Sequence, residues 1–191
     1  MPSALIHIQT GKYFCPEADV KFFVGTIAPD CTRGRQKKDR LHLRTSRDRN
    51  ADLKKLRDGY FLEDSFQMGT LLHLFTDMLW DGGPQEDFHR LYPRDTNEWF
   101  LPYRRQISIA SAYMFNGLSW AMPLWERMLN IDNSQINSVE CFPPYEIKRY
   151  LEYGYWWHTS NLVGPSTVYT PESVDRFCRS TANLFKEWLK S

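Results

Sequence analysis

The residues of this chain best suited to chemistry are His73 and Asp77, which lie four positions apart in the apolar run of residues 70–77. Four-residue spacing places both side chains on one face of a helix, where an imidazole nitrogen and a carboxylate oxygen can bind one cation. The pair therefore indicates a metal site. The alternatives are a His–Asp hydrogen bond within the core or an exposed pair without a ligand. Gly69 costs about 1 kcal/mol of helix propensity relative to alanine, so we expect another element to approach it closely.

Three residues upstream could complete this site. Asp30 follows Ala28 and Pro29, and the fixed φ of proline can hold a carboxylate in one direction at the end of a helix. His7 and His42 each lie between two apolar residues, so a helix or turn can direct them inward. Each residue also has an ordinary explanation: a turn or capping residue for Asp30, a surface histidine for His42, and a hydrogen-bonded core histidine for His7.

The order of these residues resembles the zinc-dependent phospholipase C superfamily, which also includes fungal single-strand-specific nucleases, and most of all its small intracellular bacterial members. The resemblance covers roughly residues 1–81 and rests on His7, Ala28-Pro29-Asp30, Lys38-Asp39-Arg40-Leu41-His42 and His73-x-x-x-Asp77. It implies an all-helical fold in which one zinc ion is bound by Asp30, His42, His73 and Asp77. It further implies that Asp77 bridges to a second zinc ion, held by His7 and by the N-terminal amine and carbonyl.

The chain departs from the pattern of that superfamily after residue 81. The remaining zinc ion of the superfamily is held by two further histidines and an H-x-x-x-E pair. Here His89 is followed at that spacing by Pro93, and His158 by Leu162. Asp81, on the same face of the motif helix, could form a substitute together with His89. We therefore expect one or two zinc ions rather than three.

The chemistry expected of such a site is hydrolysis of phosphoesters. Zinc lowers the pKa of bound water to about 7, which supplies hydroxide near neutral pH for in-line attack on phosphorus. Asp30 is the candidate catalytic residue, by the resemblance and because a ligand carboxylate already lies within reach of that water. Arg40 and Arg44 flank His42 by two residues on each side and are the candidate substrate-binding residues. The expected substrate is a phospholipid head group, a nucleotide or another phosphorylated small molecule.

The distribution of charge singles out one segment. The 191-residue chain has a net charge of only +1, yet residues 31–57 contain eleven Lys or Arg residues against three Asp residues, a local excess of +8. Such an excess is typical of a surface that binds phosphate, nucleic acid or acidic lipid, and also of a solvated loop. We expect residues 31–49 to form a basic loop that carries His42.

Two other functions are open at this point. A non-catalytic protein could keep zinc only to stabilise its first half, which the incomplete third zinc site favours. A nucleic-acid-binding module could use the basic segment, with aromatic residues as stacking platforms. A helical HD-type phosphohydrolase is disfavoured because the chain has no His-Asp dipeptide. Aromatic residues of the second half could form a wall for the leaving group or pack in the core, and on one expected helix they are Tyr145, Tyr153 and Trp156.

Length and composition predict one folded domain covering residues 1–191. Aromatic residues make up 15% of the chain and charged residues 25%, as in folded globular proteins. We expect free thiols in a reducing cytoplasm, because no C-x-x-C pair occurs among Cys15, Cys31, Cys141 and Cys178, and because the N-terminus lacks a signal-peptide pattern. Residues 107–125 carry no charge, but polar residues and Pro123 interrupt them, so we expect a buried helix rather than a transmembrane segment.

Helical periodicity predominates, and we predict an all-α fold, an irregular helical bundle in a single domain. The expected helices cover one or two turns near residues 5–13 and then residues 17–27, 50–57, 63–80, 95–122, 144–157 and 171–189. The sequence Gly-Gly-Pro84 ends the motif helix, and Pro123 bends or splits the long helix that precedes it. Thr170 and Pro171 are typical of a helix N-cap and first helical position.

Overall fold

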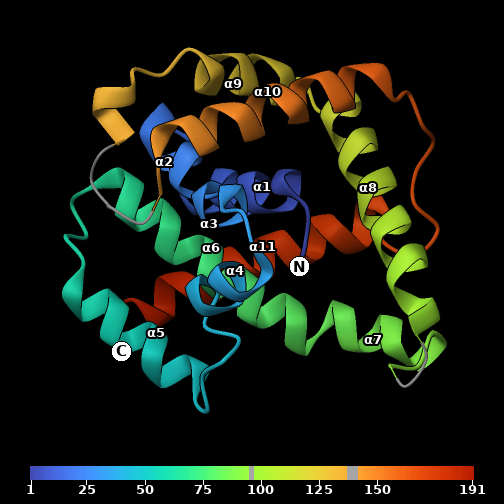
Figure 1. Ribbon diagram of the computed structural model, residues 1–191, viewed down its shortest axis with the longest axis horizontal. Helices are drawn as coiled ribbons and strands as arrows, with labels where there is room; N and C mark the ends of the chain where they lie inside the picture. The colour runs from blue at the N-terminus through green and yellow to red at the C-terminus, as the bar shows by residue number, and fades with distance from the viewer. Residues whose placement is uncertain (95–96, 137–141) are drawn as a thin grey trace.

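The computed structural model describes residues 1–94, 97–136 and 142–191 and is built from α-helices (Figure 1). The helices are α1 (Ala4–Phe14), α2 (Val20–Gly25), α3 (Ala28–Cys31), α4 (Arg35–Leu41), α5 (Arg49–Gly59), α6 (Ser65–Gly82), α7 (Pro84–Leu91), α8 (Phe100–Gly117), α9 (Ala121–Leu129), α10 (Pro144–Ser160) and α11 (Pro171–Trp188). Short 3-10 turns occur at Asn97–Trp99 and Asn133–Ile136. No strand occurs in these three ranges, which confirms the all-α prediction.

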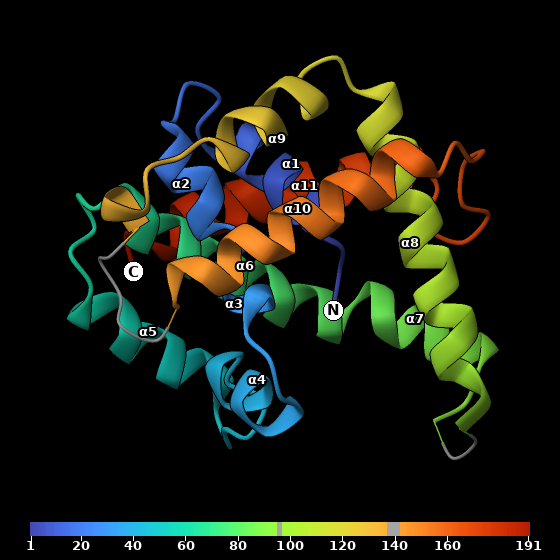
Figure 2. The same ribbon diagram turned by 45° about the horizontal axis from the view of Figure 1, so that its top comes forward.

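The middle of the molecule is formed by α1 and α6. Residues 4–11 of α1 and residues 69–77 of α6 are buried without interruption. The first of these helices packs along α11 and the second along α2. In both views α9 and α10 lie beside each other, and α8 lies across one end of the molecule (Figure 1, Figure 2). Because these two helices are surrounded on all sides, their polar residues are brought into the interior along with the apolar ones.

Two glycines allow α2 and α6 to approach each other backbone to backbone. A Cβ atom at Gly69 would lie 2.1 Å from the carbonyl oxygen of Phe22, and one at Gly25 would lie 2.2 Å from that of Phe66. A larger residue at either position would force the two helices apart. The close approach expected at Gly69 is therefore confirmed, and it brings the C-terminal end of α2 against the N-terminal part of α6.

Side-chain caps fix where several helices begin. The side chains of Asp19, Asp64 and Thr170 accept hydrogen bonds from backbone N–H groups at the starts of α2, α6 and α11. These N–H groups have no partner within the helix, so the caps stabilise the first turn. The predicted beginning of the last helix at Pro171 is confirmed, and α6 begins and ends within two residues of its expected bounds.

The expectation of a loop over residues 31–49 is wrong in part, because α4 lies inside that segment. None of the residues of α4 is buried, so the segment lacks the apolar periodicity that marks the other helices. Its arginine, glutamine and lysine residues are nevertheless good helix formers. The turn at Pro29 also differs from expectation, because the proline lies in the first turn of α3, where its missing N–H costs little.

Two further expectations are corrected. The uncharged residues 107–125 do not form one buried helix, because α8 ends at Gly117 and α9 begins at Ala121. The break precedes Pro123, which lies in the first turn of α9. The Gly-Gly-Pro84 sequence ends α6 and also starts α7, which was not expected. The expected helix start at Asp95 lies outside the described residues, and α8 begins at Phe100.

Cysteine residues form no disulfide in the part of the chain that the structure describes. Cys15, Cys31 and Cys178 are free thiols, and Cys141 lies outside the described residues. Within the same ranges, no helix has both the length and the apolar character needed to cross a membrane.

Candidate metal centre

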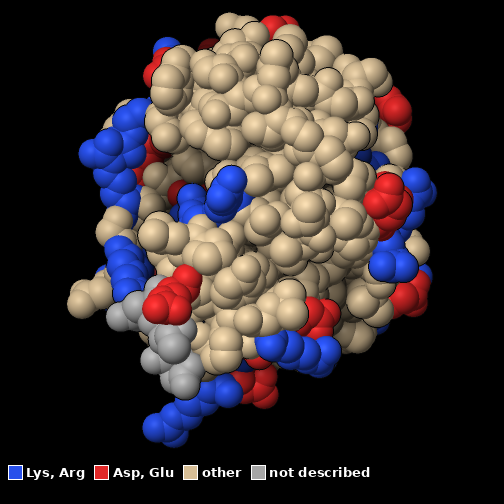
Figure 3. Space-filling view, turned by 90° about the vertical axis from the view of Figure 1, so that its right-hand side faces the viewer, with Lys and Arg blue, Asp and Glu red and all other residues tan. Residues whose placement is uncertain are grey.

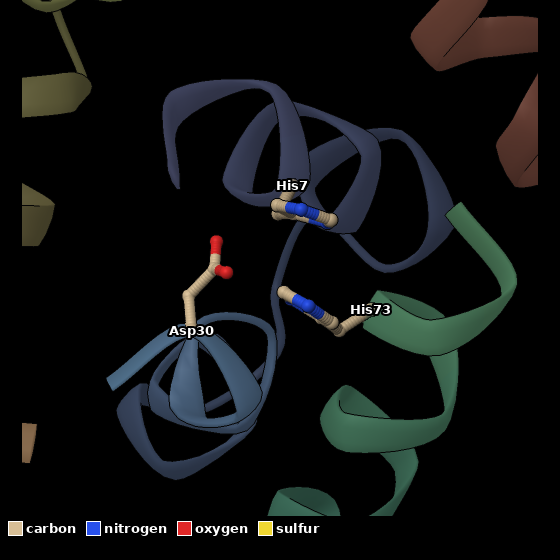
Figure 4. A group of neighbouring side chains, drawn as sticks. All are labelled: His7, Asp30 and His73. Atoms are coloured by element: carbon tan, nitrogen blue, oxygen red, sulfur yellow. The ribbon is translucent and has the colours of Figure 1, made fainter. Parts of the chain in front are cut away.

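Five buried side chains from separate parts of the chain meet in the interior: His7, Asp30, His42, His73 and Asp77. His7 belongs to α1, Asp30 to α3 and His42 to the C-terminal end of α4, while the other two belong to α6. Their exposed fractions range from 0% to 7%. Figure 4 shows His7, Asp30 and His73 converging from three elements. The structure thus brings together all five residues that the sequence suggested as metal ligands, which we call the ligand cluster.

The ligand cluster consists of two overlapping groups. Nε2 of His42 lies 3.1 Å from Nε2 of His73, 3.5 Å from Oδ2 of Asp77 and 3.5 Å from Oδ1 of Asp30. Nε2 of His7 lies 3.4 Å from Oδ1 of Asp77, and the His7 ring stacks on the His73 ring with centroids 3.8 Å apart. The ligand atoms of His42, His73 and Asp77 all lie within 4.8 Å of one another, as do those of His7, Asp30 and His73.

Backbone carbonyls orient two of the imidazole rings. Nδ1 of His73 lies 2.7 Å from the carbonyl oxygen of Thr26, and Nδ1 of His42 lies 2.7 Å from that of Lys38. A carbonyl oxygen can only accept, so each Nδ1 carries a proton and donates it. In the neutral rings, both Nε2 atoms then direct lone pairs at each other across 3.1 Å. Such lone pairs repel, so a cation or an additional proton between them is required.

Other polar atoms of the cluster have no hydrogen bond at all. Both ring nitrogens of His7 and Oδ1 of Asp77 are buried without a hydrogen-bond partner among the described residues, because their 3.4 Å contact lacks hydrogen-bond geometry. Each buried polar atom left in this way costs about 1–3 kcal/mol. Imidazole nitrogens together with carboxylate oxygens suit zinc and other first-row divalent metals. The cluster could therefore hold a metal ion.

Basic side chains accompany both carboxylates of the cluster. Nζ of Lys38 lies 2.8 Å from Oδ1 of Asp30, and Nη2 of Arg44 donates to Oδ2 of Asp77 at 3.0 Å. Burial by itself raises the pKa of Asp30, but Lys38 and the neighbouring imidazoles outweigh burial and hold that pKa well below its usual value. Burial of Asp77 is likewise outweighed by the imidazoles around it, so its pKa is lowered. Burial lowers the pKa of His73 well below its usual value. The carboxylates are therefore charged and the His73 ring is neutral at pH 7.

The two predicted substrate-binding arginines lie in different surroundings. Arg44 turns inward, because besides Asp77 it contacts Asp81 at 3.3 Å. Arg40 is exposed on α4, and its side chain forms no ion pair or hydrogen bond with residues of the described ranges. Only Arg44 is thus next to the ligand cluster.

Two basic residues at the cluster were missed by reasoning from the sequence. Lys38 lies one helical turn before His42, and this spacing was a usable signal for a shared face. Arg49 begins α5 and donates to Asp81 at 2.9 Å, with a second nitrogen 3.9 Å from Asp77. No local pattern indicates Arg49, because its approach depends on how the chain returns after α4.

The N-terminal amine of Met1 lies beside the ligand cluster. It donates to Oε1 of Gln85 at 3.0 Å and to the hydroxyl of Tyr103 at 2.9 Å, and it lies 3.6 Å from Oδ1 of Asp81. Burial lowers the pKa of this amine, and the carboxylates of Asp77 and Asp81 oppose that effect only in part. Residues of α6, α7 and α8 thus hold the amine close to the acidic side of the cluster.

The two remaining histidines lie apart from the cluster. Nδ1 of His89 lies 3.1 Å from the carbonyl oxygen of Tyr92, to which it donates. Within the described ranges, the groups that could hold a metal include neither His89 nor Asp81, so the substitute site considered for these two is not formed. His158 accepts a hydrogen bond from Ser111 at 2.8 Å, and burial lowers its pKa to about 4.

One cavity borders the cluster, and another is lined by residues that contact the cluster. The smaller, of about 270 Å³, is lined by Asp30 and Lys38 and by aromatic residues of α10, among them Tyr153. The larger, of about 550 Å³, is lined by Asp81 and by five arginines among other residues, and one of these arginines, Arg44, contacts Asp77. A further cavity of about 590 Å³ between α7 and α11 touches no residue of the cluster. Of the aromatic face expected on residues 144–157, Tyr145 and Trp156 are exposed and border neither of the first two cavities.

Comparison with known proteins adds no relative. The chain matches no known family model, no curated protein and no solved structure. The chemistry of the ligand cluster is therefore inferred from its residues and their geometry.

Proposed function

We propose that this protein is a metal-dependent hydrolase of phosphoesters that uses one or two zinc ions. The observation that carries the proposal is the 3.1 Å distance between the Nε2 atoms of His42 and His73, whose Nδ1 atoms both donate to carbonyls. A shared metal ion accounts for this contact and for the burial of three imidazoles with two carboxylates. The resemblance to the zinc-dependent phospholipase C superfamily supplies the type of reaction.

The resemblance to the superfamily supplies the assignment of ligands. Asp30, His42, His73 and Asp77 would hold one zinc ion, and His7 with Asp77 and the N-terminal amine would hold the other. The sharing of Asp77 is supported by its two oxygens, because Oδ2 faces His42 and Oδ1 faces His7. Zinc bound here would act as a Lewis acid and lower the pKa of water to about 7.

Asp30 is the residue to which we assign the orientation or deprotonation of water. It borders the smaller cavity, and Lys38 keeps its carboxylate charged, so the carboxylate can accept a hydrogen bond from water there. Arg44 would pair with phosphate oxygens next to the cluster. Arg40 borders neither cavity and has no part in this proposal.

The expected substrate is a phosphorylated small molecule, a nucleotide or a phospholipid head group. Nucleic-acid binding through the basic segment is disfavoured, because Lys38, Arg44 and Arg49 pair with buried or partly buried carboxylates instead of facing solvent. A non-catalytic protein with a structural zinc ion is the competing proposal, since the third zinc site of the superfamily is not formed.

The proposal is tested first by metal content. Elemental analysis of the protein without an added tag should find one to two zinc ions per chain, because a metal ion between the facing imidazoles would relieve the repulsion of their lone pairs. Protein that carries no metal after purification in zinc-containing medium would contradict both the hydrolase and the structural-zinc proposals.

Hydrolysis of a chromogenic phosphodiester separates these two proposals. Asp30→Asn, compared with the wild type at equal measured zinc content, should lower kcat about 100-fold or more, because removing a general base typically costs that much. Asp58→Asn, an exposed carboxylate of α5 with 68% of its side chain accessible, is the matched control and should retain wild-type activity. A zinc-loaded wild-type protein that hydrolyses no phosphoester would leave only the structural role.

A further inference from the structure

Five arginines border the larger cavity beside the ligand cluster: Arg35, Arg44, Arg49, Arg94 and Arg104. They come from α4, the segment after it, the start of α5, the segment after α7, and α8. The acidic residues that border the same cavity are Asp39 and Asp81, so basic side chains outnumber acidic ones by three. We call this space the arginine cavity.

Two of these arginines already form ion pairs with carboxylates of α6. Arg44 contacts Asp77 and Asp81 at 3.0 and 3.3 Å, and Arg49 contacts Asp81 at 2.9 Å. These ion pairs are at least partly buried, so both guanidinium groups are held in place. They form the inner wall of the arginine cavity.

The other three guanidinium groups are available to a ligand. Arg35 lies 3.7 Å from Asp39 with its side chain 94% exposed, and Arg94 pairs with Glu86 at the surface. Arg104 is exposed and forms no ion pair with residues in the described part of the chain. Exposed ion pairs contribute only about 0–1 kcal/mol. A dianionic group can therefore displace them at little cost.

The arginine cavity is placed so that one molecule can reach both it and the ligand cluster. Asp81, which borders the cavity, follows Asp77 by one turn of α6. Met1 and Arg104 border both this cavity and the smaller aromatic one. Figure 3 shows Lys and Arg side chains gathered beside a hollow near one edge of a face whose upper part is largely uncharged. Other Lys and Arg side chains lie along the right-hand and lower edges of the same face.

We propose that the arginine cavity binds a second anionic group of the substrate, so that the preferred substrate is a phosphoester carrying a further phosphate. This inference rests on the proposed function. Guanidinium groups bind phosphate through paired, charge-assisted hydrogen bonds, and a cluster of them suits a dianion better than a neutral group. A simple diester would fill the cluster and leave three arginines without a ligand.

Binding of inorganic pyrophosphate tests the cavity without any turnover. Calorimetric titration of the protein as purified should give a Kd that rises about tenfold in Arg94→Gln/Arg104→Gln, as expected for losing two partly exposed charge pairs. Arg105→Gln is the matched control, because Arg105 is the exposed neighbour of Arg104 on α8 and does not border the cavity. Equal Kd values in the double variant and the control would overturn the proposal.

Kinetics with two matched substrates test the selectivity. One is the p-nitrophenyl phosphodiester of ethylene glycol, and the other is the same diester with a phosphate on the free hydroxyl. The phosphorylated diester should have a kcat/KM about tenfold higher, and the double variant should remove this advantage, whereas Arg105→Gln should retain it. Equal kcat/KM values in the wild-type protein would contradict the second anionic subsite.

The two experiments distinguish an error in the proposed function from an error in the role of the arginine cavity. If neither diester is hydrolysed, the proposed function is wrong, and the arginine cavity is judged by the pyrophosphate titration alone. If both diesters are hydrolysed equally and the Kd for pyrophosphate is the same in the double variant and the wild type, the proposed function stands and the arginine cavity has no role in it.

Discussion

At the scale of single residues, the buried histidines differ in which atoms lie around Nε2. The Nε2 atoms of His42 and His73 face each other and the carboxylates, so no residue in the described ranges donates a hydrogen bond to them. Nε2 of His158 instead accepts from Ser111, and its ring stacks on Phe115, so its hydrogen bonds are complete. Burial alone therefore does not distinguish a candidate metal ligand from a core histidine. The two kinds of histidine are distinguished by whether Nε2 has a hydrogen-bond donor.

His158 gives a prediction about stability against pH. Its folded-state pKa of about 4 lies below the ordinary value of 6.5, so between these values the unfolded chain binds more protons than the native one. Stability is therefore lost as pH falls through this window, by about 2 kcal/mol at pH 5. Chemical denaturation at pH 7.5 and pH 5 should show that His158→Gln, which can still accept from Ser111, loses about 2 kcal/mol less than the wild type. Parallel losses in both proteins would contradict the assigned pKa.

At the scale of elements, the position of His73 depends on the contact between α2 and α6. Gly25 and Gly69 let the two backbones touch, and the residue after Gly25 provides the carbonyl that orients the His73 ring. The helix that carries two ligands is thus fixed against the element that sets the tautomer of one of them. A substitution that disturbs the packing of α2 against α6 should therefore also weaken metal binding.

Gly69→Ala tests this coupling. A Cβ atom at position 69 would lie 2.1 Å from a backbone carbonyl, so α2 and α6 must separate, and we expect a loss of at least ~2 kcal/mol together with a lower zinc content. Gly82→Ala is the control on the same helix, because nothing lies within 4 Å of its Cβ position, and it should be neutral or slightly stabilising. Denaturation curves and elemental analysis measure both effects. Similar results for the two variants would argue against the coupling.

At the scale of the whole molecule, the first residues of the chain contact three helices that lie far along the sequence. The Met1 amine reaches Gln85 of α7 and Tyr103 of α8, while His7 reaches Asp77 of α6. The N-terminus lies near the middle of the molecule and the C-terminus lies at its edge (Figure 1). Changes at the two ends should therefore have different consequences.

Extending each end of the chain tests this difference. A tag placed before Met1 would remove the buried amine and push a peptide bond toward Asp81, so zinc content and phosphoesterase activity should both fall. The same tag after Ser191, which is exposed, should leave both unchanged. Elemental analysis of the two tagged proteins provides the measurement. Equal zinc content in both would show that the amine is not a zinc ligand.

The helical class and two candidate metal ligands on one helix follow from local sequence patterns. His73 and Asp77 share a face because of their four-residue spacing, and the N-cap at Thr170 set the start of α11. The sequence did not indicate α4, because helix propensity without buried apolar residues leaves no periodic pattern. Local rules act over a few residues, so they predict helices and shared faces and little more.

The charged side chains beside these candidate ligands depend on how the helices pack. Arg40 and Arg44 are equivalent in the sequence around His42, yet only Arg44 turns toward Asp77. Arg49 joins it through the turn between α4 and α5, which no short pattern encodes. The direction of a long side chain depends on which helices pack beside it, and that packing is set by contacts between residues far apart in the chain.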